Sequence, residues 1–336
     1  MTGDNPVSRA NPALVEVKLR ALARVTTGSD LTFVDTGVGA GMCGDVGFYL
    51  ADDEPRAVGR ALHWAAARAL TRVEILASCG AADLARRARL IAAGPGPSIG
   101  VWDVRGAVAS AATPVPAHEP PVLPAHHWTL AGLISDAGAR PVDDHGWLVA
   151  EVAGLEVARV VDLPAEAGPQ PAATIEVGVG QADRELSALI HTDDDPSTGL
   201  RRVVASVVQH RNSHSHHPFT RLARERWLRS IVLDRPGLVD AVELAPLVPL
   251  RARRGLNRTE PSAAGGRLSS GRPVMVLAMV GVDPDLIPEA ADYRQCWNPE
   301  ALVVLALPPR DLALSTRLLD RLPDASAVAL APPWNH

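Results

Sequence analysis

Two carboxylates lie in strand-like segments near the middle of the chain. Glu156 is part of GLEVARVVD (residues 154–162), and Glu176 is part of TIEVGVGQADRE (residues 174–185). A pair of carboxylates can hold Mg²⁺ or Mn²⁺, and a bound metal ion can lower the pKa of a coordinated water so that it becomes a nucleophile. We therefore treat Glu156 and Glu176 as candidate catalytic and metal-binding residues. Whether they converge depends on the strand register, which the sequence does not fix.

The alternation of apolar and polar residues gives each acid a simpler interpretation. In the second segment the apolar residues face one side and Glu176 faces the other, as in any half-buried strand. In the first segment, alternation predicts that Leu155 and Val157 share one face, with Arg159 as a further candidate for it. The opposite face is then expected to hold Glu156, Ala158 and Val160. Such apolar neighbours favour a role for Glu156 over simple exposure.

The order helix, strand, GLEVARVV, IEVGVG, helix in residues 126–192 is similar to the core of the PD-(D/E)XK, or restriction-endonuclease-like, superfamily. The resemblance implies that an acid on the second strand and a (D/E)xK motif on the third hold a divalent cation, while the lysine orients the attacking water. Carried over residue by residue, Glu156 and Glu176 match the two acids, but the lysine position is Gly178. Lys18 is the only lysine of the chain. The resemblance therefore implies a degenerate core, for which an inactive or strongly divergent member fits as well as an active one.

A glycine-rich string, FVDTGVGAGMCGD, follows the first helical segment. It resembles the first motif of Rossmann-like S-adenosylmethionine methyltransferases, in which glycines after a strand let the backbone approach the cofactor. The resemblance implies these cofactor-binding candidates: Asp35, Gly37, Gly39 and Gly41. A helix should follow at once, yet CGDVGFYLAD has the pattern of a second strand. A glycine-rich hairpin or flexible loop is thus the alternative.

Arginine is concentrated in residues 201–260, which hold twelve arginines against five carboxylates. The string FTRLARERWLR places Arg221, Arg224 and Arg229 among apolar residues, and a basic helix face of this kind could contact nucleic-acid phosphates. The alternative is a solvated helix in a chain that uses arginine in place of lysine.

Two further polar strings are most simply loops. QHRNSHSHHPF spaces His210 and His214 like metal ligands on a helix, but its Asn and Ser residues favour a solvated turn that binds metal only incidentally. HTDDDPSTG has the composition of a turn that caps the next helix.

Composition excludes several chemistries. The 336 residues are 47% hydrophobic and 21% charged, and the net charge of −5 argues against a chain that generally coats nucleic acid or a membrane surface. There is no GxxxxGK[ST] phosphate loop and no GxSxG elbow. The three cysteines are far apart, which predicts buried thiols in a reducing compartment. No signal-like start and no membrane-length apolar run is present, so we expect a cytoplasmic protein with no membrane partner.

The pattern of segments predicts an α/β fold with Rossmann-like β/α segments at both ends and a central α/β unit of three adjacent strands plus helices. The expected boundaries are an N-terminal segment at 1–110, a Pro-rich linker at 111–125, a central nuclease-like unit with Arg-rich helices at 126–244, a linker at 245–272 and a C-terminal segment at 273–336. We also expect the two terminal segments to share one sheet.

Three function classes remain open from the sequence. The first is a nucleic-acid-interacting protein with a degenerate nuclease-like core. The second is an enzyme that binds S-adenosylmethionine or a nucleotide through Asp35–Gly41. The third is a non-catalytic scaffold. Salt-dependent retention on DNA or RNA would support the first, and thermal stabilisation by S-adenosylmethionine would support the second.

Overall fold

The computed structural model describes residues 11–51, 56–163, 172–190, 195–211, 216–253 and 255–334, without the side chains of 187–190. Its described elements confirm the predicted α/β class, because helices are interleaved with mixed sheets that include parallel strand pairs. The chain divides into two compact units, which are described separately below. Unit 1 comprises 1–117, 283–297 and 315–323, and unit 2 comprises 118–282, 298–314 and 324–336.

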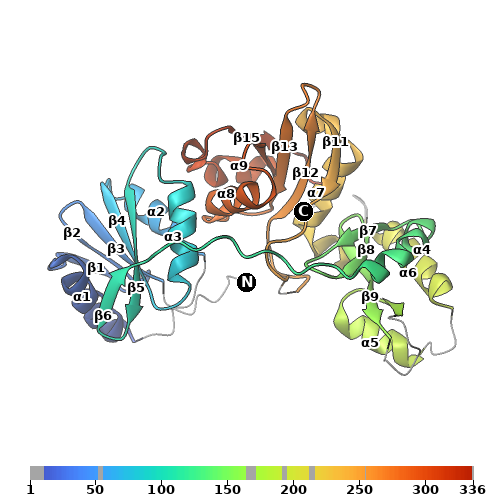
Figure 1. The fold of residues 1–336 in the computed structure, drawn as a ribbon, viewed down its shortest axis with the longest axis horizontal. Coiled ribbons are helices and arrows are strands. Elements are labelled where there is room, and N and C mark those ends of the chain that lie inside the picture. The colour runs from blue at the N-terminus through green and yellow to red at the C-terminus, as the bar shows by residue number, and fades with distance from the viewer. Residues whose placement is uncertain are drawn as a thin grey trace. The chain divides into compact units, whose positions relative to one another are not determined.

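Unit 1 is built on a sheet that has the strand order β1-β2-β3-β4-β5-β6 within the described residues (Figure 1). The strands are β1 (Phe33–Asp35), β2 (Ala40–Cys43), β3 (Val46–Ala51), β4 (Arg72–Ala77), β5 (Ser98–Arg105) and β6 (Val108–Ala111). The pairs β3–β4 and β4–β5 are parallel and the other pairs are antiparallel. Only the middle of the sheet therefore follows the β/α alternation of a Rossmann-like unit.

Helices cover both faces of this sheet. They are α1 (Pro12–Thr27), α2 (Val58–Ala66) and α3 (Ala81–Leu90). The Asn11 side chain caps α1 by accepting a hydrogen bond from the amide of Ala13 at 3.0 Å, and apolar residues of α1 pack on one sheet face with Phe48. On the opposite face, Gly47 leaves room for the indole of Trp64 in α2, since a Cβ there would come within 2.6 Å of it.

The C-terminal segment contributes a helix to unit 1, not strands to its sheet. Helix α8 (Leu286–Trp297) packs against α2 and α3, and Arg87 of α3 forms a buried ion pair with Asp292 of α8 at 2.5 Å. The prediction that the terminal segments share one sheet is wrong, because the C-terminal strands belong to a sheet of unit 2. Strand periodicity alone does not determine which sheet a buried strand joins.

Unit 2 contains an antiparallel sheet with the order β10-β9-β8-β7. These strands are β7 (Arg140–Asp143), β8 (Leu148–Val152), β9 (Leu155–Asp162) and β10 (Ala173–Val177). The associated helical segments are η2 (Ala125–Leu130), α4 (Ala131–Asp136), α5 (Gln181–Ile190), α6 (Pro196–His210) and η4 (Pro218–Arg221). Apolar residues of α6, among them Leu200, Val204 and Val207, close the core on one face of this sheet.

A β-bulge in β9 changes which residues share a face. Ala150 pairs with Ala158 and Glu151 with Glu156, so β9 has one residue more than β8 between these pairs. Because the extra residue reverses the alternation, Arg159 lies on the face of Glu156, while Ala158 and its neighbour Val160 are buried in the core. The face assignment expected for residues 158–160 is therefore wrong.

The second sheet of unit 2 has the order β11-β12-β13-β14-β15. Its strands are β11 (Ala241–Pro246), β12 (Ser262–Leu268), β13 (Pro273–Ala278), β14 (Leu302–Leu307) and β15 (Ala325–Ala329). The helical segments that accompany it are α7 (Arg224–Asp234), η5 (Pro236–Val239) and α9 (Pro309–Ser315), whereas η6 (Leu319–Arg321) belongs to unit 1. Helix α7 packs on this sheet and also reaches the first one, where a Cβ on Gly154 would lie 2.2 Å from the backbone of Arg226.

The expected linker at 245–272 is wrong in part. Strand β12 falls inside it and is an inner strand, paired with both β11 and β13. Its sequence, SAAGGRL, lacks the alternation of apolar and polar residues that predicts a strand. Small residues stand there instead, because other strands and helices approach this strand closely. A Cβ on Gly266 would lie 1.9 Å from the carbonyl oxygen of Glu243. By contrast, residues 112–124 of the Pro-rich segment form no helix or strand.

Two smaller expectations can be compared with the fold. None of the described cysteines forms a disulfide, but Cys79 and Cys296 are exposed, so the prediction that the thiols are buried is wrong for these two. Among the described helices, none has the length and apolarity needed to cross a membrane.

Candidate functional site

A cavity of about 420 Å³ opens on the face of the first unit 2 sheet that carries Glu156. Its charged and aromatic lining consists of Asp144, Trp147, Glu156, Arg159, Arg184 and Arg253. The volume lies in the range of ordinary small-ligand pockets. Three of these side chains are guanidinium groups from three separate segments, so the cavity is rich in donors that suit a carboxylate or phosphate.

A tight hairpin turn places Asp144 and Trp147 at the cavity. His145 and Gly146 have φ values of 58° and 84°, as the two central residues of a type I′ turn require. The amide of Asp144 donates to the carbonyl of Trp147 at 2.8 Å, and the Asp143 carboxylate accepts from the amide of Gly146 at 2.8 Å. The turn leaves the Trp147 side chain 44% exposed at the rim of the cavity.

Glu156 is held by two arginines. Arg159 donates to both of its carboxylate oxygens, at 3.0 and 3.2 Å, and Arg184 of α5 donates to Oε1 at 2.8 Å. Glu156 and Arg184 are buried, and the Arg159 guanidinium also lies 5.1 Å from the ring centroid of Trp147. Glu156 thus orients the guanidinium groups of two arginines at the cavity wall, and its carboxylate does not face open space.

The two candidate acids do lie on one sheet face, but an arginine separates them. Glu176 pairs with Arg159 in the β9–β10 register, so it shares the face of Glu156. Nε of Arg184 is 4.0 Å from the Glu176 carboxylate, while another nitrogen of the same guanidinium binds Glu156. A permanent cation between the acids does not fit Mg²⁺ or Mn²⁺ at this position.

Gly178 shows why the lysine of the nuclease-like motif has no counterpart. Its φ of 151° is rarely adopted by residues with a side chain, and a Cβ would lie 2.7 Å from the backbone nitrogen of Arg184. The start of α5 therefore passes directly over this position. Any side chain there, lysine included, would push α5 and Arg184 away from Glu156.

Buried ion pairs support the floor of the cavity. Arg226 of α7 donates to Asp144 at 2.6 Å and to Glu151 of β8 at 2.8 Å, and Arg229 pairs with the same Glu151. Burial alone would raise the pKa of Asp144, but the Arg226 guanidinium holds it below its ordinary value. Asp144 is therefore a fixed negative charge in the neutral pH range.

Arg253 completes the lining from the connection between β11 and β12. Its guanidinium pairs with buried Glu225 of α7 at 3.0 Å. Burial lowers its pKa, as does the nearby Arg226. Within the described residues, Nε of Arg184 donates no hydrogen bond although it is buried. Its ion-pair partner Glu176 lies 4.0 Å away, beyond hydrogen-bond distance, so this buried donor remains unsatisfied.

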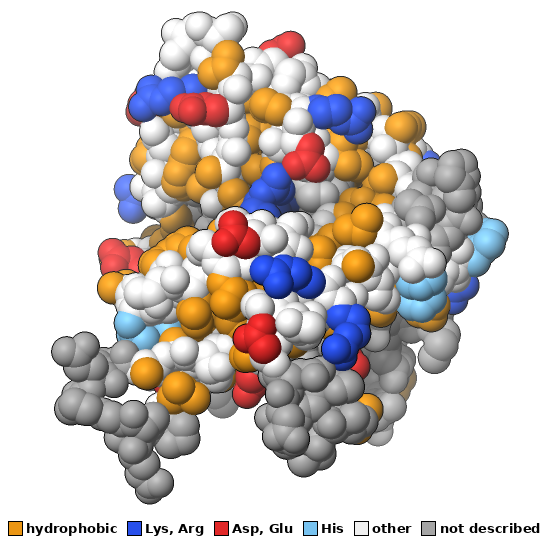
Figure 2. Space-filling model, turned by 90° about the vertical axis from the view of Figure 1, so that its right-hand side faces the viewer, with side chains coloured by type: hydrophobic (Ala, Val, Ile, Leu, Met, Phe, Trp, Pro, Cys, Tyr) orange, Lys and Arg blue, Asp and Glu red, His pale blue; other side chains and the backbone are white. Residues whose placement is uncertain are grey.

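The predicted basic face of residues 221–229 does not form. Arg221 is exposed, Arg224 is half-buried and stacks 5.1 Å from the Trp334 ring, and Arg229 is buried against Glu151. The three arginines therefore point to different surroundings, and the prediction of a shared nucleic-acid-binding face is wrong. On the face of the molecule drawn in Figure 2, Lys and Arg side chains are interspersed with Asp, Glu and hydrophobic ones.

The glycine-rich string forms the turn of a β-hairpin in unit 1. Strand β1 ends at Asp35 and β2 begins at Ala40, so a strand and not a helix follows the loop. The carboxylate of Asp35 accepts from the amide of Val38 at 3.3 Å and pairs with Arg68 at 3.3 Å. Gly37 lies within the turn, Gly39 has a φ of 73°, and Gly41 lies in β2. This is the hairpin alternative, without the helix N-terminus that the methyltransferase motif needs.

The two other polar strings are described only in part. His214 and the acids at 193 and 194 lie outside the described residues. Asp195 accepts from the amide of Thr198 as the N-cap of α6, which confirms the capping role predicted for this turn. The rings of His210 and His217 stack with centroids 4.5 Å apart.

Comparison of the chain with protein-family models, with curated proteins and with solved structures gave no match. The resemblance to the restriction-endonuclease-like core therefore stays a prediction. The sequence does not single out Asp144, Arg184 or Arg253 as site residues. They are far apart in the chain and only the fold brings them together, and none of them lies in a recognisable sequence motif.

Proposed function

We propose that this chain binds nucleic acid, with a phosphate and an adjoining base held in the unit 2 cavity, and does not cut it. The observation that carries the proposal is the convergence of three guanidinium groups and an exposed tryptophan on one cavity of about 420 Å³. Guanidinium groups bind phosphate through paired hydrogen bonds, and a base can stack on an exposed indole. The net charge of −5 agrees with a local site and not with a basic coat.

The same geometry argues against metal-dependent cleavage by Glu156 and Glu176. Arg184 lies between the two acids, and the lysine position holds a glycine that has no space for a side chain. These two features support the hypothesis of a nuclease-like core that is inactive. The hairpin at Asp35–Gly41 removes the main support for a methyltransferase, and a scaffold is the function that remains if no nucleic acid binds.

Fluorescence anisotropy of labelled single-stranded and double-stranded DNA and RNA oligonucleotides, at low and at physiological salt, tests the proposal. We expect salt-dependent binding of the wild type, since phosphate contacts release counterions. Trp147→Ala should weaken it by about 1–3 kcal/mol, the usual cost of losing one stacked base. No cleavage should follow when Mn²⁺ is added.

Matched variants make the outcome specific to the cavity. Trp128 is 46% exposed and lies in η2, outside the cavity, so Trp128→Ala should leave affinity unchanged. Likewise, Arg159→Gln should weaken binding, whereas Arg140→Gln, which removes an exposed partner of Asp234, should not. Failure of every oligonucleotide to bind at low salt, or equal losses in the two tryptophan variants, would contradict the proposal.

A further inference from the structure

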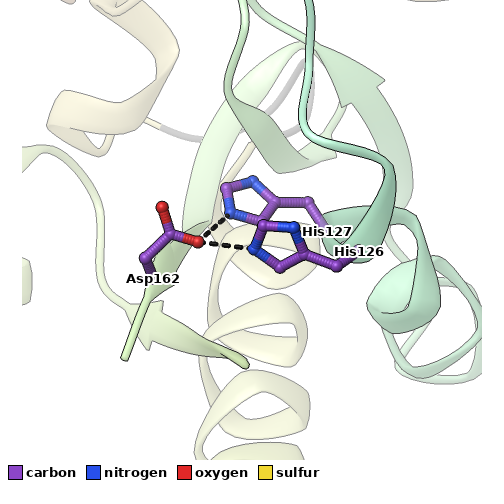
Figure 3. A group of neighbouring side chains, drawn as sticks. All are labelled: His126, His127 and Asp162. Carbon is purple, nitrogen blue, oxygen red and sulfur yellow. Dashed lines mark hydrogen bonds and ion pairs between the residues drawn. The ribbon is translucent and has the colours of Figure 1, made fainter. Parts of the chain in front are cut away.

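A second cluster of ligand-type side chains lies at the other end of β9. His126 and His127 of η2 both point toward Asp162, the last residue of the strand, as Figure 3 shows. Their Nε2 atoms lie 2.6 and 2.9 Å from the same oxygen, Oδ1 of Asp162. All three ligand atoms are within 4.8 Å of one another.

The fold explains why residues so far apart in the sequence meet here. Asp162 lies two residues beyond the buried Val160 and so points to the core face of the sheet, opposite Glu156. Segment η2 packs against β9 and β10 at this end of the core, which brings both imidazoles over the strand end. Asp162 follows Glu156 by six residue steps along the strand, about 20 Å. The cluster is therefore separate from the cavity.

We propose that His126, His127 and Asp162 bind a divalent transition-metal ion, with Zn²⁺ as the ion that the donor set suits best. Two imidazoles and one carboxylate are typical of three-ligand zinc sites that keep a position open for water or substrate. Two nitrogen donors out of three disfavour Mg²⁺ and Ca²⁺, which prefer oxygen. The partly exposed carboxylate leaves the remaining positions accessible from solvent, with 63% of its side chain exposed.

The distances need only a small adjustment. With metal–ligand bonds of about 2.0–2.1 Å, tetrahedral ligands lie roughly 3.3 Å apart. The present nitrogen–oxygen distances are shorter by less than an ångström, and the exposed Asp162 can move outward to accommodate the ion. His127 is 2% exposed, so its ring is already fixed by packing.

The surroundings of His127 also set the expected affinity. A ring that binds a metal through Nε2 carries its proton on Nδ1, and metal-binding histidines usually donate that proton to an acceptor. Within the described residues, the buried Nδ1 of His127 has no partner. Because a hydrogen-bond partner of this kind contributes 10–100-fold in metal affinity, we expect a dissociation constant on the order of 0.1 µM, about 100-fold above a nanomolar one.

Isothermal titration of the tag-free full chain with ZnCl₂ tests the site, with visible absorption of bound Co²⁺ as a second readout of nitrogen and oxygen coordination. Asp162→Ala and His126→Ala should each weaken binding by at least about 10-fold. Both residues are partly exposed, so these variants avoid the folding risk of replacing buried His127. Circular dichroism checks that the fold persists.

The stacked pair His210 and His217 provides the matched control. A His210→Ala/His217→Ala double variant should keep the wild-type Zn²⁺ affinity, which Asp162→Ala lowers. The proposal is overturned if the wild type takes up no Zn²⁺ at about 100 µM, which is well above the expected constant. It is equally overturned if binding persists in Asp162→Ala and His126→Ala but disappears in the control, because the ion would then lie at the other histidines.

Discussion

Asp285 at the start of α8 should make unit 1 less stable as the pH rises. Its side chain is 1% exposed, and Oδ1 accepts a hydrogen bond from the amide of Gly59 at 2.9 Å, while Oδ2 has no partner among the described residues. Burial raises its pKa from 3.8 to about 6, and the neighbouring Asp283 adds to the shift. The amide of Gly59 and the guanidinium groups of Arg56 and Arg87 oppose it.

The sign and size of the effect follow from proton linkage. Between pH 3.8 and about 6, the folded state binds the Asp285 proton more tightly than the unfolded state does, so the free energy of unfolding falls as the pH rises. A shift of about two pKa units corresponds to roughly 3 kcal/mol once both states are ionised. About half of this, roughly 1.5 kcal/mol, should be lost between pH 5 and pH 8.

Asp285→Asn removes the ionisation and keeps an oxygen for the Gly59 amide. The variant's stability relative to wild type should therefore rise by roughly 1.5 kcal/mol from pH 5 to pH 8, several degrees in Tm. Differential scanning calorimetry at both pH values measures this. Any pH-independent cost of burying the asparagine amide is the same at pH 5 and pH 8, so it cancels when the two variant-minus-wild-type differences are compared. Asp320→Asn, at an exposed site of unit 1, should show no such change. A relative stability of Asp285→Asn that does not vary with pH would refute the reasoning.

Three further substitutions test close contacts and buried charges. Gly178→Lys, which restores the missing motif residue, should produce no nuclease activity with Mn²⁺ and should lower the free energy of unfolding by more than about 2 kcal/mol, because of the strained φ and the contact with α5. Gly59→Ala should destabilise unit 1 by a similar amount in thermal melts, since its Cβ would lie 1.8 Å from the carbonyl oxygen of Pro284. Glu151→Gln should cost about 3–5 kcal/mol in denaturant titrations, because it leaves buried Arg229 without its carboxylate, whereas Asp234→Asn at an exposed pair should cost under about 1 kcal/mol.

The sequence predicts individual helices and strands better than it predicts how they pair and pack with one another. The strand at residues 155–162 and the helix that starts at Pro12 follow from periodicity and capping. The bulge at Val157 does not, because it depends on how β8 and β9 pair, and it alone decides that Arg159 and Glu156 meet. Strand β12 was missed for the opposite reason: its small residues are dictated by close approach of other chain segments and carry no alternation.

The candidate sites show the same limit. Glu156 was predicted as a site residue from its position in an apolar strand, and it does line the cavity. Its partner Arg184 lies in a helix, and no local pattern distinguishes it from the many other arginines of this chain. His126 and Asp162 are 36 residues apart, and only the packing of η2 on β9 makes them neighbours.

Glu156 itself separates the two interpretations of this sheet face. At a metal site its loss would abolish function, because a cation would lose a ligand. In the present geometry Glu156 instead pairs with Arg159 and Arg184 and offsets one of their two positive charges, so Glu156→Gln raises the net charge of the cavity by one. An added charge about 5 Å from a phosphate contributes roughly 0.8 kcal/mol even at the dielectric constant of water, about fourfold in affinity. We therefore expect Glu156→Gln to bind oligonucleotide more tightly at low salt, with the gain shrinking as salt is added. Weaker binding by a variant that still melts cooperatively would show that Glu156 contributes to ligand binding directly, against the anion-site interpretation.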